Sequence, residues 1–285
     1  MPATITAAIA IEPLQSEPIQ SIRVRRQAGE PLKSLAQEAG LSWQRLWGLL
    51  YPTGTSTGKK TPRPPGPLTE RYRPLTLADI CGQEEAVGVL GRFAQHPYST
   101  AYLFDGETGT GKTSAALALA NALGCDLSKQ EFGGVYVIAS GEQSADSVRE
   151  TCRMMYNAPW HGSGWKVVVV NEADRMSSPA ETVWLDRLEA LPPKTVVIFT
   201  TNYPGKLSQR FVDRCTRLTF VSDAEKLRAS ATQFASAIWK SETGRKPDPA
   251  RIQQIVQSVE ANGQISFRRI VQALTVALGS EGGNE

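Results

Sequence analysis

The octapeptide GETGTGKT at residues 106–113 constrains the fold of this chain more than any other feature. It follows the apolar run AYLF, which has the length of a strand, and leads into SAALALANAL, which has the composition of a helix. A glycine-rich turn in this context lets backbone N–H groups close around phosphate oxygens, and the helix N-terminus adds a partial positive charge. The spacing therefore predicts the phosphate loop of a nucleotide-binding α/β domain.

The residue types within the loop predict particular contacts with a nucleotide. The side chain of Lys112 would reach the β- and γ-phosphates, and the hydroxyl of Thr113 would hold Mg²⁺. The sequence thus predicts ATP and Mg²⁺ as cofactors. The expected loop contacts are Gly106, Thr108, Gly109, Thr110, Gly111, Lys112 and Thr113.

Five short apolar runs predict the strands of this domain, at residues 101–104, 135–139, 167–170, 196–201 and 217–221. Helical stretches such as 114–123 and 180–191 separate them, and near-continuous apolar strands separated by helices indicate a parallel sheet covered on both faces. After residue 223 the strand pattern stops, and the periodicity predicts three helices at 224–240, 249–261 and 267–278. We expect a P-loop α/β domain with a five-stranded parallel sheet and a C-terminal helical lid.

Composition divides the rest of the chain into shorter segments. The stretch PTGTSTGKKTPRPPGP has no apolar periodicity and predicts a flexible tether after a small all-α N-terminal module. The predicted boundaries are a disordered N-terminus at 1–18, the module at 19–51, the linker at 52–68, the nucleotide-binding domain at 69–222, the lid at 223–278 and a disordered tail at 279–285.

Composition also excludes several classes of protein. No apolar run reaches the roughly 18 residues that a membrane span needs, and the N-terminus lacks the basic start and apolar core of a secretory signal, so we expect a cytoplasmic protein. The four cysteines are scattered singly, which indicates neither a zinc module nor a disulfide framework. Residues 1–68 hold eight Lys or Arg against four Asp or Glu, and this basic end points to nucleic acid as a partner.

Polar residues follow the third and fourth predicted strands, where ligands of magnesium and water are expected. In VVVVNEAD, Glu172 has the position of a catalytic base, but Asn171 stands where an Asp normally supports magnesium. An amide oxygen accepts a hydrogen bond from a magnesium-bound water but brings no negative charge. We therefore expect binding to survive better than hydrolysis. Asn202, after the fourth strand, would position the attacking water.

Further motifs extend this pattern in order along the chain: LTERYRPLTLADICGQEEAV, YVIASGEQSADSVRE, NEADRMS, LDRLEALPPKTVVIFTTN and the DRC of residues 213–215. Together with the phosphate loop, they resemble the clamp-loader type of AAA+ ATPase, in particular the small subunit of replication factor C. The resemblance covers roughly residues 69–275, which makes it far more specific than any single motif.

The resemblance implies roles for residues outside the loop. Those that would frame the adenine are Tyr72, Arg73, Pro74, Ile80 and Cys81. Asn202 corresponds to the first sensor, Arg268 to the second sensor on the lid, and Arg214 to the arginine finger that reaches the nucleotide of a neighbouring subunit. The chain would then belong to a homo- or hetero-oligomer. DNA would meet helix starts in a central channel, at Ser144, Arg149 and Ser177.

Three departures from the family pattern bear on activity. Asn171 replaces the usual acid, which puts turnover in doubt. Asp213 replaces the Ser before the finger, and its carboxylate could pair with Arg214 within one subunit and hold it back. The sequence given stops after the lid, before the helical collar that clamp-loader subunits use for assembly.

The segment LKSLAQEAGLSWQRLWGLLY at 32–51 has the spacing of a helix-turn-helix. Its second helix would expose Trp43, Gln44, Arg45 and Trp47. That face suits a DNA major groove, a hydrophobic protein contact or a structural bundle. In the DNA-binding case, phosphate contacts would come from Arg23, Arg25 and Arg26.

Three functions remain open on these grounds. The first is a DNA-associated AAA+ ATPase that oligomerises and loads or remodels a protein partner on DNA. The second is a helper ATPase of transposition or helicase loading, which the tethered N-terminal module and the lack of a collar favour. The third is a nucleotide-dependent structural subunit that scarcely hydrolyses ATP, which Asn171 favours.

Overall fold

The computed structural model describes residues 21–22, 25, 38 and 66–281 of the 285-residue chain. It divides the chain into two units, Met1–Gly58 and Lys59–Glu285. Apart from Glu38, the predicted helix-turn-helix at 32–51 lies outside the described residues, as do Arg23, Arg26, Gln44, Arg45 and the last four residues of the predicted tail. Arg25 is described, and its Nη1 donates to Oε2 of Glu38 at 2.8 Å.

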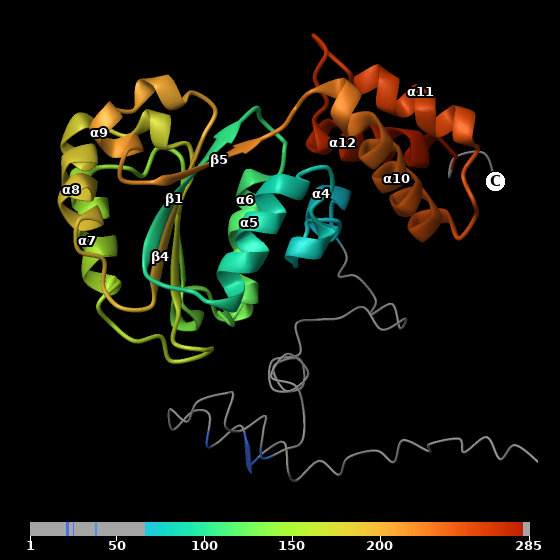
Figure 1. Cartoon of the computed structure of the whole chain (residues 1–285). Helices are drawn as coiled ribbons and strands as arrows, with labels where there is room; N and C mark the ends of the chain where they lie inside the picture. Colours follow the sequence, from blue (N-terminus) through green and yellow to red (C-terminus); the bar gives the residue numbers. More distant parts are fainter. Residues whose placement is uncertain (1–20, 23–24, 26–37, 39–65, 282–285) are drawn as a thin grey trace, which may run out of the picture. The chain divides into compact units, whose positions relative to one another are not determined.

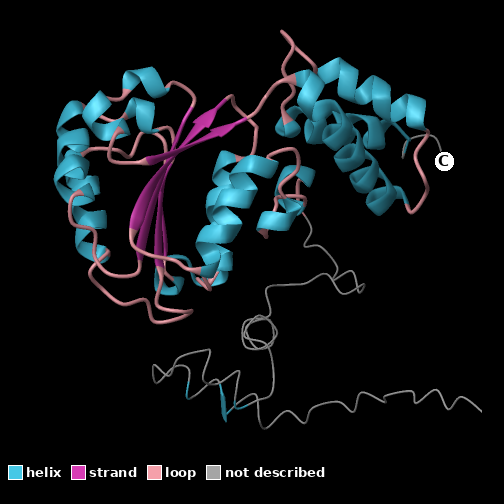
Figure 2. Cartoon of the chain, viewed as in Figure 1, coloured by secondary structure: helices cyan, strands magenta, loops and turns pink. Residues whose placement is uncertain are grey.

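A five-stranded parallel sheet forms the centre of the second unit, in the order β2-β3-β4-β1-β5 (Figure 2). The strands are β1 (Thr100–Gly106), β2 (Val135–Ile138), β3 (Lys166–Val170), β4 (Thr195–Thr201) and β5 (Thr216–Phe220). The predicted parallel sheet is thus confirmed. Because all strands run the same way, their carboxyl ends meet at one edge of the sheet, where Asp105 of β1 lies opposite Thr201 of β4.

Alternating side chains from each strand bury the two faces of the sheet. In β3, Val167 and Val169 enter one apolar cluster, whereas Val168 and Val170 enter the other, so every residue of the strand is buried. Helices α5 (Glu84–Gln95) and α6 (Lys112–Ala122) cover the first face. Helices α7 (Ala145–Met154), α8 (Ser178–Leu188) and α9 (Gln209–Val212) cover the second (Figure 1). This burial on both faces explains why the strands read as continuous apolar runs.

The lid has an apolar core of its own. It consists of α10 (Ala224–Thr243), α11 (Pro249–Val259) and α12 (Phe267–Glu281), which extends three residues beyond the predicted end. Asp223 caps α10 by accepting a hydrogen bond from the N–H of Lys226. The short helix α4 (Leu68–Arg71) begins the described part of this unit, and Leu68 packs into the lid cluster. The segment that leads into the nucleotide-binding domain is thus anchored on the lid.

Short 3-10 helices complete the secondary structure: η1 (Leu77–Asp79), η2 (Leu127–Gly133), η3 (Ala173–Arg175) and η4 (Pro204–Lys206). Over the described ranges, no helix combines the length and apolarity needed to cross a membrane.

An aromatic stack on the second face supports α9. Phe211 is fully buried and meets Phe199 edge to face with 4.7 Å between ring centroids, and Phe199 in turn meets Trp184 at 5.1 Å. We expect Phe211→Ala to lower the free energy of unfolding by about 3–5 kcal/mol, because truncation removes apolar contacts and leaves a cavity. Urea denaturation of this variant and of Val276→Ala, an exposed lid position, provides the measurement and its control. A loss below about 1 kcal/mol for Phe211→Ala would contradict the packing described.

Candidate functional site

The phosphate loop connects the end of β1 to the start of α6, and its glycines are needed where they stand. Gly109 has φ +81°, and a Cβ there would lie 2.1 Å from Oγ of Ser266 in the lid. Gly106 has φ +141°, and a Cβ there would lie 2.4 Å from the carbonyl oxygen of Phe220. Larger residues would therefore clash with the lid at one position and with β5 at the other.

Lys112 lies on the first turn of α6 and is buried, with 8% of its surface exposed. Its Nζ donates to the carbonyl oxygens of Gly106 at 2.6 Å and Glu107 at 2.8 Å, and to Oδ1 of Asn202 at 2.8 Å. Desolvation lowers the pKa of Lys112 to about 8, although the carboxylates of Glu107 and Asp105 act in the opposite direction. A phosphate oxygen would give this ammonium a charged acceptor in place of neutral ones, and such bonds are stronger.

The predicted magnesium residues face each other across the sheet edge. Oγ1 of Thr113 donates to Oδ1 of Asn171 at 2.8 Å, and Oγ1 of Thr200 reaches the same oxygen at 3.4 Å. Magnesium prefers a few oxygen ligands from protein and completes its octahedron with phosphate and water. The hydroxyl of Thr113 and the amide oxygen of Asn171 fit that role, but without the negative charge that an Asp would add.

The carboxylate of Glu172 already has two partners within the chain. Oγ of Ser140 donates to its Oε2 at 2.5 Å, and Nε of Arg175 lies 3.0 Å from the same oxygen. The backbone of Glu172 is left-handed, with φ +52°, and Gln143 supports it. The buried amide of Gln143 donates to the carbonyl of Asn171 and, at 3.3 Å, to that of Glu172. Loop 139–144 therefore holds the predicted catalytic base by both its side chain and its backbone.

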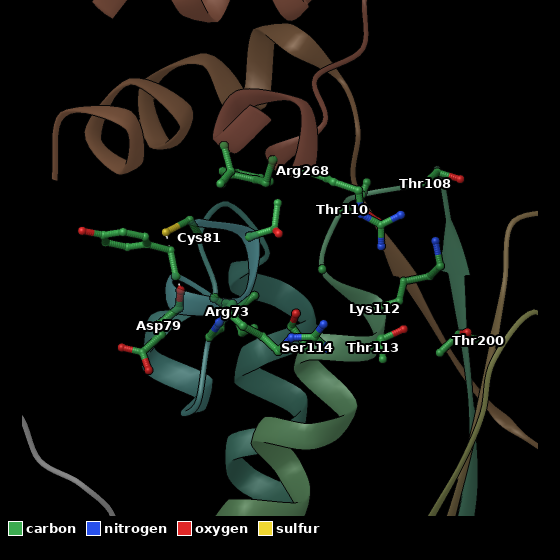
Figure 3. Close-up of a pocket in the computed structure, with 18 of the residues that line it drawn as sticks. Arg73, Asp79, Cys81, Thr108, Thr110, Lys112, Thr113, Ser114, Thr200 and Arg268 are labelled. Atoms are coloured by element: carbon green, nitrogen blue, oxygen red, sulfur yellow. Dashed lines mark hydrogen bonds between the residues drawn. The ribbon is translucent and has the colours of Figure 1, made fainter. Parts of the chain in front are cut away.

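These groups share one cavity of about 550 Å³, a size suited to a nucleotide. Figure 3 shows Lys112, Thr113 and Thr200 on one side, Arg73 and Cys81 on the other, and Arg268 extending from the lid. The lining contains the five residues predicted for the adenine, the loop residues from Thr108 to Thr113, and Asn171, Glu172, Asn202 and Arg268. The structure thus brings the other predicted nucleotide residues together, whereas Gly106, at the start of the loop, is not among the lining residues. Backbone contact between Phe267 N–H and the carbonyl of Gly109, at 3.1 Å, joins lid to loop.

A family model described as "DNA polymerase III, delta subunit" matches residues 82–224, half of the chain. The chain belongs to this clamp-loader family. The replication factor C small subunits of Picrophilus torridus and Methanosphaera stadtmanae are each 28% identical, over 72% and 73% of this chain. The matches span 67% and 63% of those relatives, so the chain corresponds to about two thirds of their length.

Two solved structures share the fold of this clamp-loader-family protein. A single-residue variant of Thermotoga maritima RuvB superposes with a TM-score of 0.56 at 16% identity, over 72% of this chain and 64% of RuvB. A DNA polymerase III gamma subunit-related protein of Thermotoga maritima gives 0.50 at 17% identity, over 68% and 60% of the two chains. With the strand order above, these likenesses confirm the predicted AAA+ fold.

In this clamp-loader-family protein, Arg214 lies outside the nucleotide cavity and follows α9. Its Nη2 pairs with the carboxylate of Glu189, and its Nη1 donates to the carbonyl of Arg210 at 3.1 Å. Asp213 accepts a hydrogen bond from Nε2 of Gln209 at 2.6 Å. The possible pair between Asp213 and Arg214 is therefore not formed. Asp213 binds Gln209 of α9, and Arg214 pairs with Glu189.

The residues predicted to meet DNA have local partners. Ser144 caps α7 by accepting from the N–H of Ser147 at 3.2 Å, and Ser177 caps α8 by accepting from that of Ala180 at 3.4 Å. Nη1 of Arg149 donates to Asp146 at 2.6 Å. Contacts of these residues with DNA stay a prediction.

Sequence reasoning missed four residues that bind the site or its neighbours: Gln83, Ser140, Gln143 and Glu189. Polar side chains in loops and at helix ends carry no characteristic spacing, and the partners of these four lie 25 or more residues away along the chain. Only the folded arrangement identifies them.

The environment of Lys112 generates a prediction for its titration. A ¹³C NMR titration of lysine Cε resonances, assigned with Lys112→Met, should give Lys112 a pKa of about 8 in the free protein. Added tripolyphosphate should raise this pKa, because an adjacent anion favours the charged ammonium. Binding of polyphosphate would then weaken as pH rises above about 8, since the protein must take up a proton to bind. A Lys112 resonance that titrates near the ordinary 10.5 would contradict the desolvated environment.

Proposed function

We propose that this protein is an AAA+ ATPase subunit that binds ATP and Mg²⁺ between sheet and lid, oligomerises, and acts on DNA or on a DNA-bound partner. The observation that carries this proposal is the convergence of Lys112, Thr113, Asn202 and Arg268 on one cavity of nucleotide size. The chain reaches that cavity from three sides: the phosphate loop, the end of β4 and the lid. A chance match to the loop motif would not bring the other two elements to the same place.

Each group has a role that follows from its chemistry. Lys112 and Arg268 would neutralise phosphate oxygens from the loop side and the lid side. Thr113 and, through a bound water, Asn171 would hold Mg²⁺, which would supply positive charge to the phosphate oxygens. Asn202 would orient the attacking water, and Glu172 would accept its proton. Ser140 and Arg175 both bind Oε2 of Glu172, so proton transfer to that oxygen would require the carboxylate to exchange these partners.

Action on DNA is supported by the names of the relatives. The similar proteins are called replication factor C small subunits, and the family model carries the name of a DNA polymerase III subunit. We infer a replication-associated role from these likenesses. Arg214 is the candidate for contact with the nucleotide of a neighbouring subunit, which would place complete catalytic sites between subunits.

A second candidate is a subunit that uses ATP mainly as a structural ligand. Asn171 favours it because the amide brings no charge to the magnesium site, and the two partners of Glu172 favour it because they occupy the catalytic carboxylate. The two candidates differ in turnover.

ATP turnover with and without DNA, compared between the unmodified protein and Asn171→Asp, separates these candidates. For the ATPase we expect turnover that DNA stimulates, and an increase on the order of tenfold in Asn171→Asp, equivalent to ~1.4 kcal/mol of barrier. The matched control is Asn157→Asp, which makes the same change at an exposed residue that does not line the cavity and should leave the rate unchanged. Negligible turnover that only Asn171→Asp restores would favour the structural subunit. Absence of ATP binding would reject both.

Within one chain, Arg214 pairs with Glu189. We expect this pair to compete with the contact that Arg214 would make with the nucleotide of a neighbouring subunit. Glu189→Gln should strengthen ATP-dependent self-association up to about fivefold, because an exposed pair of this kind contributes about 0.2–1 kcal/mol. Mass photometry with a slowly hydrolysed ATP analogue measures the association, and Glu85→Gln on the exposed surface of α5 is the control.

Arg214→Ala should abolish stimulated turnover. An Arg214→Ala protein with full stimulated turnover would exclude the role in trans.

A further inference from the structure

Gln83 precedes α5 and is almost completely buried, with 3% of its surface exposed. Its side-chain amide binds both backbone groups of Val221: Nε2 donates to the carbonyl oxygen at 2.8 Å, and Oε1 accepts from the N–H at 2.8 Å. One side chain thus pairs with the main chain of Val221 as a neighbouring strand would. An amide can do this because it offers a donor and an acceptor side by side.

Val221 lies where the sheet gives way to the lid. Strand β5 ends at Phe220, and Asp223 caps the first lid helix. Two backbone hydrogen bonds join this connection to the lid. The N–H of Ile265 donates to the carbonyl oxygen of Ser222 at 2.8 Å, and the N–H of Ala224 donates to that of Gly263 at 2.8 Å. The connection at 221–224, called the hinge below, is therefore bound by Gln83 from the sheet side and by the lid itself.

The segment that carries Gln83 also touches the nucleotide cavity and the lid. Ile80 and Cys81, directly before it, line the cavity. Gly82 has φ +70°, and a Cβ there would lie 2.4 Å from Cδ2 of Leu227 in α10. Four consecutive residues, 80–83, thus contact the cavity, the lid and the hinge in turn.

The same amide approaches the phosphate loop. Nε2 of Gln83 lies 3.5 Å from the carbonyl oxygen of Thr110, a long contact beside the short bond to Val221. The group is shared between a loop that lines the cavity and the hinge of the lid. A displacement of Thr110 would change the balance between the two acceptors, and no water is needed to carry the effect because the amide is buried.

We infer that Gln83 is a positioning residue that couples occupancy of the nucleotide cavity to the orientation of the lid. The inference rests on the proposed function only in assuming that a nucleotide fills the cavity. Gln83 makes no contribution to the chemistry. Its amide transmits a shift of the phosphate loop and of residues 80–81 to the hinge, and through the hinge to Arg268 on α12.

Two substitutions separate the donor from the acceptor. Gln83→Met keeps the length of the side chain and removes both bonds to Val221. Gln83→Glu keeps an acceptor for the N–H of Val221 but sets oxygen against the carbonyls of Val221 and Thr110, which leaves both without a donor. The matched controls are Gln95→Met and Gln95→Glu, at the exposed end of the same helix.

Hydrogen-exchange mass spectrometry of the full chain, with and without ATPγS, tests the coupling. In the unmodified protein, the analogue should slow exchange of the hinge and of α10 at least about threefold. In Gln83→Met and Gln83→Glu, binding measured with a fluorescent ATP analogue should stay within about tenfold, while the slowing in the hinge and α10 is lost. The Gln95 variants should respond like the unmodified protein.

The outcomes distinguish this inference from the proposed function. If the unmodified protein binds no analogue, the proposed function fails. If it binds but the hinge does not respond, or if a folded Gln83 variant shows the same slowing as the unmodified protein, the coupling role of Gln83 is overturned. A hinge that does not respond in the unmodified protein overturns the inference even where a variant does not fold.

Discussion

The parallel direction of β1, β3 and β4 brings three sequence-distant residues to one edge of the sheet. Lys112 follows β1, Asn171 follows β3 and Asn202 follows β4, and hydrogen bonds link them there through Thr113 and the loop. Everything else in the site depends on this edge. The lid is joined to the phosphate loop by the hydrogen bond from Phe267 to Gly109, and the residues predicted to frame the adenine line the same cavity.

Two charged groups of the cavity, Lys112 and Glu172, and Arg214 outside it have partners within the single chain. Lys112 donates to neutral oxygens, Glu172 is held by Ser140 and Arg175, and Arg214 is paired with Glu189. A phosphate, a water or a second subunit could replace these contacts. The ion pairs of Glu172 and Arg214 are partly exposed, and such pairs contribute little. Under the proposed function, activity would depend on exchange of these partners.

The sequence predicted the sheet and the phosphate-loop turn that lines the cavity because both rest on local patterns. Apolar runs with strand length and a glycine-rich turn have the same form in sequence and in structure. Other features depend on contacts between distant segments. Leu68 packs into the lid cluster although it precedes the predicted nucleotide-binding domain. Its helix, α4, has only four residues, which is too short for an apolar periodicity that would indicate this packing. Arg214 pairs with Glu189 and not with the adjacent Asp213, and Gln83 binds Val221, 138 positions away. Neither pairing has a signature in the order of residues.

Isothermal titration of the full chain with ATP and Mg²⁺ tests the central claim most directly, namely that the cavity between sheet and lid is a nucleotide site. The account predicts saturable binding to a single site and a loss of affinity on the order of a hundredfold in Lys112→Ala, because a buried charged contact with phosphate is removed. Absence of binding in the unmodified protein, or equal affinity in Lys112→Ala, would contradict it.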